Sequence, residues 1–378
     1  MQRKLICAGH VCLDITPVFA PDAESDFASL LTPGRLVHTG AADIHTGGSV
    51  ANTGLALKLL GNDVTLLGKI GTDAFGSIVK SIFASYDAGG LIEDRSATTS
   101  YSVVLAPPGQ DRVFLHHPGA NDTFSSADVP EDALKNAALF HFGYPPIMRR
   151  MYENGGAELA TLFRRVKAHG VATGLDLAAV DPDSDAGRAD WERILSAVLP
   201  DTDFFMPSFE ELCRMLDRER YARFDPHADI TEQIDLLRDA KPLAERALDL
   251  GCRVVLIKCG VAGMYLRTAD RVALQKTGNR VALDPAHWAD REILQPCLCA
   301  DRVLSGTGAG DTSIAAFLTA VLNGCSPEWC AALAAAEGAC CVTEYDALSG
   351  LLPLTALSER LKKGWKTMKQ GELQCLSI

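Results

Sequence analysis

A glycine-rich loop late in the chain carries the strongest chemical signal in the sequence. Residues 305–311 are Ser-Gly-Thr-Gly-Ala-Gly-Asp. Apolar residues then recur at the spacing of one helix face: Ile314, Phe317, Leu318, Val321 and Leu322. Such a loop lets backbone N–H groups converge at the positive end of a helix dipole, which favours an anion, typically a phosphate. The sequence therefore predicts that this loop forms an anion site.

The carboxylate of Asp311 needs an explanation, because an acid beside a phosphate site is repelled unless it has a task. Accepting the proton of a hydroxyl that attacks phosphorus is such a task, so we interpret Asp311 as a general base. A structural alternative is that Asp311 only caps the helix, which leaves the three glycines unexplained. The loop lacks the Lys-Ser/Thr of a Walker A motif, and Asp311 stands where the dinucleotide fingerprint needs a third glycine.

A second glycine-rich segment, residues 46–54, leads into another helical window. The pair Gly47-Gly48 lets a small polar ligand approach the backbone, and Asn52 offers both a donor and an acceptor to a hydroxyl. The same pattern also fits a simple turn before a helix. We expect Asp14 at the end of the first strand, where strand ends line the ligand crevice of an open α/β sheet.

The elements that must position these groups alternate along the chain. Short β-branched apolar runs are separated by amphipathic windows, which is typical of a parallel or mixed sheet covered by helices. The predicted strands are 5–8, 64–67, 101–106, 139–142, 172–175, 204–206 and 254–257. The predicted helices are 49–60, 75–85, 156–169, 188–199, 209–217, 233–250 and 312–322. Residues 16–46 and 110–122 break this alternation, and we expect them to form a lid.

Composition restricts the class of protein. The 378 residues are 47% hydrophobic and 22% charged, which indicates a globular chain. A net charge of −12, with no basic run longer than a pair, argues against a nucleic-acid partner. No apolar run reaches the roughly 18 residues of a membrane span. The longest, around residues 315–322, is expected to be a core helix.

The cysteines and the N-terminus indicate a compartment. Twelve cysteines without a CxxC pair favour buried thiols over a zinc site or a disulfide scaffold. The first residues meet charge at Asp14 before a signal-peptide pattern develops. We therefore expect a cytoplasmic, reduced protein with no membrane partner.

Taken together, the motifs resemble those of the ribokinase-like (PfkB) carbohydrate kinases. The first family signature is matched by Gly47-Gly48, Asn52 and Leu60-Gly61, followed by Gly71, Asp73 and Gly76. The second is matched by Gly308-Ala309-Gly310-Asp311. Further matches in the same order are Leu175-Asp176, residues 207–211 and residues 258–263. The resemblance spans roughly residues 4 to 353.

The resemblance implies an α/β fold, a three-layer αβα sandwich with a mostly parallel central sheet and a small β lid. Residues 1–378 would form one ribokinase-like kinase domain. The lid would comprise roughly residues 15–46 and 98–122, and a homodimer would form through it. The stretches 217–232 and 276–296 match no element of the family, so we expect them to be surface elaborations.

The resemblance also implies a role for individual residues. It makes Asp311 the general base, and the anion hole for the γ-phosphoryl group would be Gly308, Ala309 and Gly310. The residues implied to hold the acceptor substrate are Asp14, Gly47, Gly48 and Asn52. Those implied to lie at the nucleotide, ATP, are Lys258, Gly260 and Gly263. Glu211 is implied to organise the waters around Mg²⁺.

Two departures from the family pattern have consequences. Ser305 and Gly306 stand where many members have the Asp and Thr of a potassium-binding turn, so we expect K⁺ to activate this chain little. Ser208 replaces the Asn of an Asn-x-x-Glu motif. That change weakens the network around Mg²⁺ without removing Glu211.

The leading function is an ATP-dependent transfer of the γ-phosphate to a hydroxyl of a small sugar, sugar acid or nucleoside. The alternative is a catalytically weakened member of the fold that binds a sugar or nucleotide, and Ser208 and Ser305 would suit it. A methyltransferase or dehydrogenase needs the glycine loop after the first strand, whereas here it lies near the C-terminus. The sequence does not identify the acceptor.

Overall fold

A nine-stranded sheet forms the centre of the molecule. The computed structural model describes residues 4–20, 26–109, 112–281 and 283–368. The strands of the large sheet are β1 (Lys4–Gly9), β4 (Asp63–Gly71), β5 (Ile92–Asp94), β8 (Ala137–Gly143), β9 (Ala172–Leu175), β10 (Phe204–Phe205), β11 (Val254–Lys258), β12 (Met264–Thr268) and β13 (Glu292–Gln295). Their order is β13-β12-β11-β10-β9-β8-β1-β4-β5. The pairs from β11 to β5 are parallel, and β12 and β13 add two antiparallel strands at one edge.

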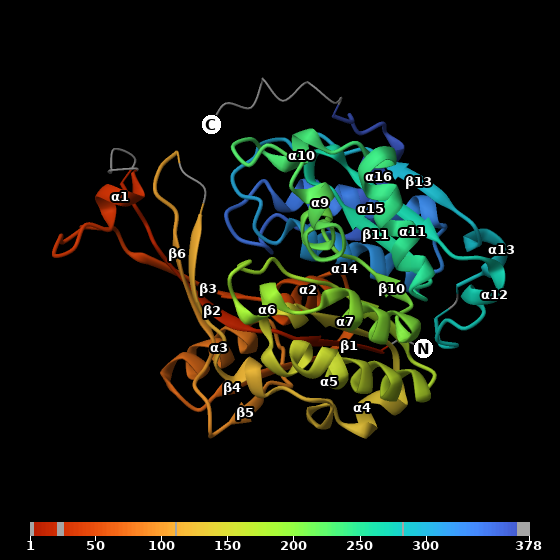
Figure 1. The fold of residues 1–378 in the computed structure, drawn as a ribbon, viewed down its shortest axis with the longest axis horizontal. Coiled ribbons are helices and arrows are strands. Elements are labelled where there is room, and N and C mark those ends of the chain that lie inside the picture. Colours follow the sequence, from red (N-terminus) through yellow and green to blue (C-terminus); the bar gives the residue numbers. More distant parts are fainter. Residues whose placement is uncertain (1–3, 21–25, 110–111, 282, 369–378) are drawn as a thin grey trace.

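Helices cover both faces of this sheet (Figure 1). One core contains α2 (Ser49–Leu59), α3 (Ala74–Ser85), α14 (Ala309–Leu322), α15 (Pro327–Cys341) and α16 (Leu354–Lys362). The other contains α5 (Arg149–Ala168), α7 (Trp191–Val198), α8 (Phe209–Leu216) and α11 (Lys241–Asp249), beside α4 (Glu131–Asn136). In β1, Leu5 and Cys7 join the first core, while Ile6 and Ala8 join the second. A strand buried on both faces is continuously apolar, which is why these strands were predictable.

Helix α14 is the central helix of the first core. Every residue from Asp311 to Leu322 is buried, and the helix packs against both α2 and α15. Its apolar character on all sides, rather than on one stripe, follows from this position. The predicted core helix is therefore confirmed, and the structure extends it back to Ala309.

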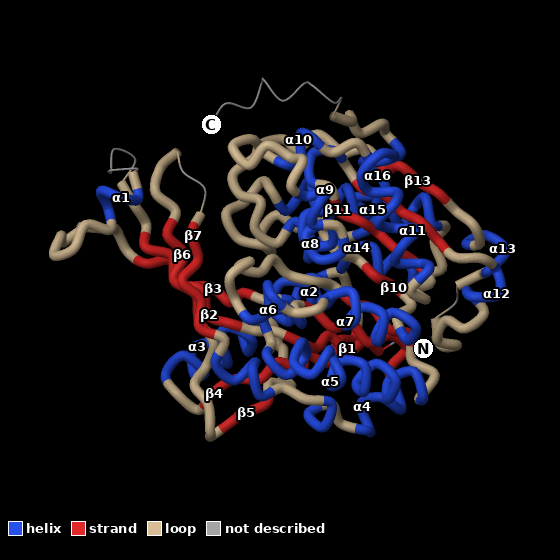
Figure 2. The backbone as a smooth tube through the Cα atoms, in the orientation of Figure 1, coloured by secondary structure: helices blue, strands red, loops and turns tan. Residues whose placement is uncertain are grey.

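A second, four-stranded sheet projects from one side of the molecule, at the left of Figures 1 and 2. It consists of β2 (Cys12–Pro17), β3 (Ala42–Gly47), β6 (Tyr101–Leu105) and β7 (Val113–His117), in the order β3-β2-β6-β7. A short helix, α1 (Phe27–Leu30), lies in the connection between β2 and β3. Phe114 and Leu115 are each 54% exposed on β7.

The position of Asp14 differs from the prediction. Strand β1 ends at Gly9, and Asp14 lies in β2 of the small sheet rather than at the end of the first strand. Gly9 has φ +130°, and a Cβ there would come within 2.2 Å of the Gly143 carbonyl oxygen. This glycine lets the chain leave the large sheet while still touching β8. The continuous sequence pattern concealed that break.

The predicted helix 233–250 is also interrupted. The structure has α10 (Ile230–Gln233), a π-helical turn over Leu236–Ala240, and then α11. Asp235 caps the turn, and a proline in the first turn of α11 fits a helix start better than a helix interior. The sequence prediction treated these separate elements as one amphipathic stretch.

The remaining helices are short: α6 (Asp185–Arg188), α9 (Arg218–Tyr221), α12 (Arg271–Leu274) and α13 (Pro285–Trp288). The predicted elaboration 276–296 includes β13, so part of it belongs to the central sheet. No helix within the described ranges is long and apolar enough to cross a membrane.

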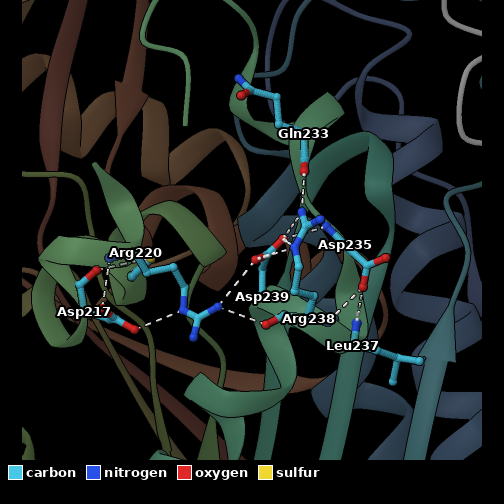
Figure 3. Close-up of polar contacts among 8 residues, drawn as sticks. Asp217, Arg220, Gln233, Asp235, Leu237, Arg238 and Asp239 are labelled. Atoms are coloured by element: carbon cyan, nitrogen blue, oxygen red, sulfur yellow. Dashed lines mark hydrogen bonds and ion pairs between the residues drawn. The ribbon is translucent and has the colours of Figure 1, made fainter. Parts of the chain in front are cut away.

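The elaboration around residues 217–239 is tied together by ion pairs (Figure 3). The Asp239 carboxylate accepts from Arg238 Nη2 at 2.8 Å and from Arg220 Nη1 at 3.4 Å. It also accepts from the Asp235 amide at 2.9 Å. Burial alone would raise the pKa of Asp239, but the hydrogen bonds from Arg238 and Asp235 and the two guanidinium charges lower it overall. This network joins α9 to the π-helical turn.

Candidate functional site

Asp311 lies in the first turn of α14 and is held by three side chains. Its Oδ1 accepts from Thr53 Oγ1 at 2.8 Å, and its Oδ2 accepts from Asn52 Nδ2 at 3.1 Å and from Tyr144 Oη at 2.7 Å. The carboxylate is 4% exposed. Asn52 and Thr53 come from α2, which packs against α14. The structure thus brings the two glycine motifs of the sequence together, with Asn52 bonded to Asp311.

The glycine-rich loop begins α14 in the predicted way. Gly308 is the N-cap with φ +77°, and the Thr312 amide donates to its carbonyl oxygen at 2.9 Å. The first amides of α14 therefore stand free of intrahelical acceptors at the positive end of the helix dipole. Ser305 Oγ accepts from the Thr307 amide at 3.1 Å. Arg112, from the loop between β6 and β7, donates to Thr307 Oγ1.

Lys258 lies against this loop. A Cβ added to Gly310 would lie 3.3 Å from Lys258 Nζ, so the ammonium is next to the backbone of the predicted anion hole. Lys258 Nζ donates to Asp176 Oδ1 at 3.0 Å. The Lys258 side chain is 11% exposed and that of Asp176 is 3% exposed. Lys258, at the end of β11, is therefore a buried cation of the site.

Negative charge exceeds positive charge around Lys258. Burial raises the pKa of Asp176, the Lys258 charge opposes this, and the charges of Glu211 and Asp311 add to it. Burial would lower the pKa of Lys258, but attraction to Asp176, Glu211 and Asp311 raises it overall. The electrostatics of Lys258 are therefore set by three acids, those of Asp176, Glu211 and Asp311.

The paired glycines position α2 beside His10 and Asp14. Gly48 is the N-cap of α2 with φ +87°, and a Cβ there would lie 2.5 Å from His10 Nδ1. A Cβ at Gly47 would lie 2.1 Å from Asp14 Oδ2. Burial raises the pKa of Asp14, while hydrogen bonds from Cys12 and Ser102 lower it in part. Only glycines fit this close approach.

Two buried histidines and a serine line the same region. His10 and His141 are 1% and 0% exposed, and Ser49 is also fully buried. Within the described residues, neither ring nitrogen of these histidines nor the Ser49 hydroxyl has a hydrogen-bond partner. Burial lowers the pKa of His141 to about 3, and the Lys258 charge contributes. Unpartnered buried polar groups are rare, so the cluster is suited to a polar ligand or to ordered water.

The small sheet reaches this region through His116. The rings of His10 and His116 have centroids 5.1 Å apart, and Ser102 Oγ lies 3.1 Å from His116 Nδ1. On its other side, the His10 ring lies 6.1 Å from that of Tyr144, measured between centroids. A chain of polar rings therefore runs from the small sheet to the partner of Asp311.

Glu211 and the Gly260 turn lie at neighbouring strand ends. The Ser208 amide donates to Glu211 Oε2 at 2.9 Å, and the Glu211 amide donates to Ser208 Oγ at 3.3 Å. This reciprocal pair is a capping box, so Ser208 performs the helix-capping part of the expected Asn. The turn Gly260–Ala262 follows β11 and packs against α10 of the elaboration.

Gly263 ends this turn. Its carbonyl oxygen accepts from the Cys259 amide at 2.8 Å, and the chain then enters β12. Within the described part of the chain, no three His, Cys, Asp or Glu side chains gather to hold a metal ion by themselves. Eleven cysteines are described, and all of them are free thiols.

Sequence reasoning missed several groups of the site. Thr53 stands in the predicted motif but was given no role, and Tyr144, His10 and His141 were not considered. One signal was present for Tyr144: it follows a buried strand and precedes two prolines. The contact of Lys258 with Asp176 joins strands 82 residues apart, so no local pattern could reveal it.

The arrangement is suited to moving a proton and stabilising an anion. A carboxylate lies in the first turn of a helix that follows a glycine loop, with an ammonium next to Gly310 and buried histidines that have unpartnered nitrogens within the described residues. Comparison with known proteins agrees with this chemistry. Residues 3–353 match the pfkB family carbohydrate kinases, so the chain belongs to this family.

Individual relatives support the assignment. An uncharacterized sugar kinase of Archaeoglobus fulgidus is 26% identical over 304 residues, which cover 79% of this chain and 98% of that protein. The fold is similar to that of Arabidopsis thaliana ribokinase, solved with ribose and ATP, with a TM-score of 0.68 and 20% identity. A fructokinase of Xylella fastidiosa with bound ATP gives 0.67 and 20%. Both alignments cover 96% of this chain and 99% of the other.

These findings confirm the predicted α/β fold with a mostly parallel sheet and a second small sheet. They also confirm that the chain is a carbohydrate kinase of an ATP-utilising family.

Proposed function

We propose that the protein transfers the γ-phosphate of ATP to a hydroxyl of a small sugar or a related polyol, with Asp311 as the general base. The observation that carries the proposal is the position of Asp311, one residue after Gly310 in the first turn of α14, where it is held by Asn52 and Thr53. A base must lie within hydrogen-bond reach of the proton that it accepts, and we place the acceptor hydroxyl on the side of Asp311 where Asn52 and Tyr144 donate to Oδ2.

The phosphoryl group needs charge stabilisation more than covalent help. The Gly310 amide and the Lys258 ammonium would bind its oxygens, because Nζ lies beside Gly310. The Ala309 amide, which donates to the Gly306 carbonyl oxygen at 3.3 Å, would exchange that bond for a phosphoryl oxygen. When the acceptor hydroxyl attacks phosphorus, its proton passes to Asp311 and the bond between the γ-phosphorus and the bridging oxygen breaks. ADP leaves with the bond electrons.

The donor side of the site is assigned to β11 and the turn after it. Lys258, Gly260 and Gly263 would contact ATP, and the excess of carboxylates around Lys258 fits a divalent cation. Glu211 would hold that Mg²⁺ through water, because its own oxygen already accepts from the Ser208 amide. When bound, Mg²⁺ neutralises charge on the phosphate oxygens.

The acceptor side is assigned to Asp14, Gly47, Gly48 and Asn52. Asp14 would accept hydrogen bonds from the hydroxyls of the acceptor, while an unpartnered nitrogen of His10 would form a hydrogen bond with a further hydroxyl. This supports an acceptor with several hydroxyls. The small sheet would act as a lid over it, since the His116 ring lies beside His10.

A homodimer through the small sheet is part of the proposal. Ile44, Val113, Phe114 and Leu115 are 40–54% exposed on its strands. Apolar side chains on a thin projecting sheet favour a partner surface. Light scattering of the wild type and of Phe114→Lys would test it, with a monomer expected for the variant. A cytoplasmic location is consistent with the free thiols of the described residues.

The test is a steady-state assay of ADP release over a panel of pentoses, hexoses, sugar acids and nucleosides. We expect at least one acceptor to stimulate ADP release, with the phosphorylated product detected by mass spectrometry. Asp311→Asn should lower kcat by about two to four orders of magnitude while acceptor affinity changes little. Near-normal kcat in this variant would remove Asp311 as the base.

A binding protein without turnover is the second candidate. It predicts acceptor binding by calorimetry without product from any member of the panel. Asp14→Ala separates the two sides of the site, because it should raise the acceptor KM far more than the ATP KM. Equal effects on both would assign Asp14 a structural role.

A further inference from the structure

Tyr144 has a backbone conformation that its residue type disfavours. It lies directly after β8 with φ +67° and ψ +38°, in the left-handed region. Bulky residues rarely adopt this region, and Pro145 further biases the residue before it toward extended conformations. Such strained residues cluster at functional sites, because the surrounding structure must hold them in place. The result of the strain is a phenol directed at Asp311.

The hydrogen bonds on Asp311 show which position remains for an acceptor hydroxyl. Each carboxylate oxygen accepts about two hydrogen bonds. Oδ2 already accepts from Asn52 and Tyr144, and Oδ1 accepts from Thr53. The Tyr144 bond, at 2.7 Å, is the shortest of the three. A hydroxyl that is to be deprotonated by Oδ2 therefore meets an oxygen that is fully occupied.

The three donors differ in how easily each side chain could move away from Asp311. Asn52 and Thr53 are adjacent in α2 and are 9% and 0% exposed. Tyr144 is half-buried at a strand end, and its ring faces His10, whose nitrogens are unpartnered. A moved phenol could therefore donate to the acceptor nitrogen of His10, which leaves the other ring nitrogen for the acceptor substrate, whereas Asn52 and Thr53 are fixed by the core. Tyr144 is the partner of Asp311 that can be exchanged.

We propose that the Tyr144 hydroxyl occupies, on Asp311 Oδ2, the place of the acceptor hydroxyl, and that the acceptor displaces it on binding. The proposal rests on the proposed function, since it takes Asp311 as the base. The phenol keeps its own proton throughout. The proton that reaches Asp311 in the reaction comes from the acceptor.

The Tyr144 hydroxyl, as a placeholder for the acceptor hydroxyl, would prevent wasteful hydrolysis of ATP by water. Burial raises the pKa of Tyr144 well above its usual value, and the charges of Asp311 and Asp176 raise it further. The hydroxyl therefore stays protonated and donates to Asp311 at physiological pH. A water molecule cannot use the same lone pair of Oδ2, so this oxygen is covered until an acceptor with enough contacts competes for it, whereas Oδ1 accepts from Thr53 and keeps one position open.

The decisive variant is Tyr144→Phe, which keeps the ring and removes only the hydroxyl. Tyr265→Phe is the matched control, because Tyr265 also donates to a carboxylate at 2.7 Å, that of Glu292, between β12 and β13. The first readout needs no identified acceptor, since water is the nucleophile. We expect ATP hydrolysis without sugar to rise roughly 3- to 10-fold in Tyr144→Phe and to stay unchanged in Tyr265→Phe.

The second readout uses whichever acceptor the panel identifies. We expect its KM and its calorimetric Kd to fall roughly 3- to 10-fold in Tyr144→Phe, with kcat within about twofold. Unchanged hydrolysis without sugar would overturn the proposal. So would a tenfold lower kcat at unchanged KM, which would make Tyr144 a positioning residue for the base. If hydrolysis rises but no panel sugar is phosphorylated, the proposed acceptor class fails while the placeholder stands.

Discussion

Two buried carboxylates at opposite ends of the same parallel strands have different surroundings. Asp203, just before β10, accepts from Lys167 Nζ at 2.8 and 2.9 Å and lies 3.3 Å from Arg253 Nη1. Backbone amides of Thr173 and Gly278 also donate to it, at 2.9 and 3.3 Å. Asp176, just after β9, has Lys258 as its one side-chain hydrogen-bond partner among the described residues.

This difference distinguishes an acid that stabilises the fold from acids that are suited to binding a ligand. At the amino ends of the strands, two cations and several donors satisfy one acid. At the carboxyl ends, three acids share one ammonium, and His141 and Ser49 have unpartnered polar atoms. A buried charge without full compensation costs stability, so the second arrangement fits the ligand site that we propose. The carboxyl ends of the strands are where open α/β sheets bind their substrates.

Removing the Asp203 charge should have the largest effect on stability. Asp203→Asn leaves Lys167 and Arg253 buried without their acid, so we expect a loss of about 3–5 kcal/mol in the free energy of unfolding. Urea unfolding followed by circular dichroism measures it. Asp176→Asn is the control and should change stability by less than half as much. Equal losses would mean that both ends of the sheet are structural.

The variant Lys258→Met tests the carboxyl ends of the strands, because it removes the ammonium there. Removing the ammonium next to Gly310 should lower kcat roughly 10- to 100-fold, because one charge on the phosphoryl oxygens is lost. The thermal midpoint should fall less than in Asp203→Asn, because Asp176, whose pKa is already raised by burial, can take up a proton once the ammonium is gone. Steady-state kinetics and a thermal melt on the same preparation measure both. A large drop in the melting temperature with normal kcat would make the pair with Asp176 a structural one.

Glu337 is a further buried acid, and within the described residues no cation pairs with it. Its Oε1 has no hydrogen-bond partner within the described residues, and Oε2 accepts from the Leu352 amide at 3.4 Å. Burial raises its pKa from 4.5 to about 8. The folded protein therefore binds a proton that the unfolded chain has released, and the free energy of unfolding falls as pH rises from 4.5 to about 8.

Glu337→Gln should remove this pH dependence. At pH 8 we expect the variant to be more stable than the wild type by about 1–3 kcal/mol, because no buried group needs a proton. At pH 4 the two proteins should be equally stable. Denaturant unfolding at both pH values is the measurement. A variant that is less stable at pH 8 would show that Glu337 has a partner in its charged form.

The smallest expected effect concerns K⁺. Ser305 is a neutral hydroxyl where a carboxylate would hold a monovalent cation, and Lys258 already provides a fixed charge next to Gly310. Replacing Na⁺ by K⁺ at constant ionic strength should change kcat/KM less than about threefold, or about 0.7 kcal/mol of barrier. A tenfold stimulation would show that other oxygens, such as those of Asp301, complete a cation site.

The strands buried on both faces were predictable because burial makes them continuously apolar, as in β1 and β9. The edge strand β13 was not, since two of its four residues are exposed and the pattern weakens. β12 was missed although it is almost wholly buried, and β7, which is exposed along its length, was expected only as part of the lid. Helix α15 was missed for the opposite reason: it is rich in alanine and cysteine and shows no stripe.

The residues of the site also fall into those that the sequence predicts and those that it does not. Asp311 and Gly308 to Gly310 lie in one contiguous motif, because the loop and helix that form an anion hole are local structure. Tyr144 joins Asp311 across 167 residues and depends on how β8 and α14 meet. A single sequence does not show how these two elements pack together. The partners of the base could therefore be identified only from the structure.

The ion-pair network around Asp239 has a consequence for local unfolding. Because Arg220 and Arg238 share the buried Asp239 carboxylate, α9 and the π-helical turn cannot separate without leaving a charge unpaired. Arg238 also donates to the Gln233 carbonyl oxygen of α10 at 3.4 Å. The amide protons of these three elements should therefore exchange with solvent as one cooperative unit, at a single free energy of opening. Since α10 packs on the Gly260 turn, that opening would also uncover the turn after β11. The stability of the segment from α9 to the π-helical turn would then determine how often the Gly260 turn is exposed to water.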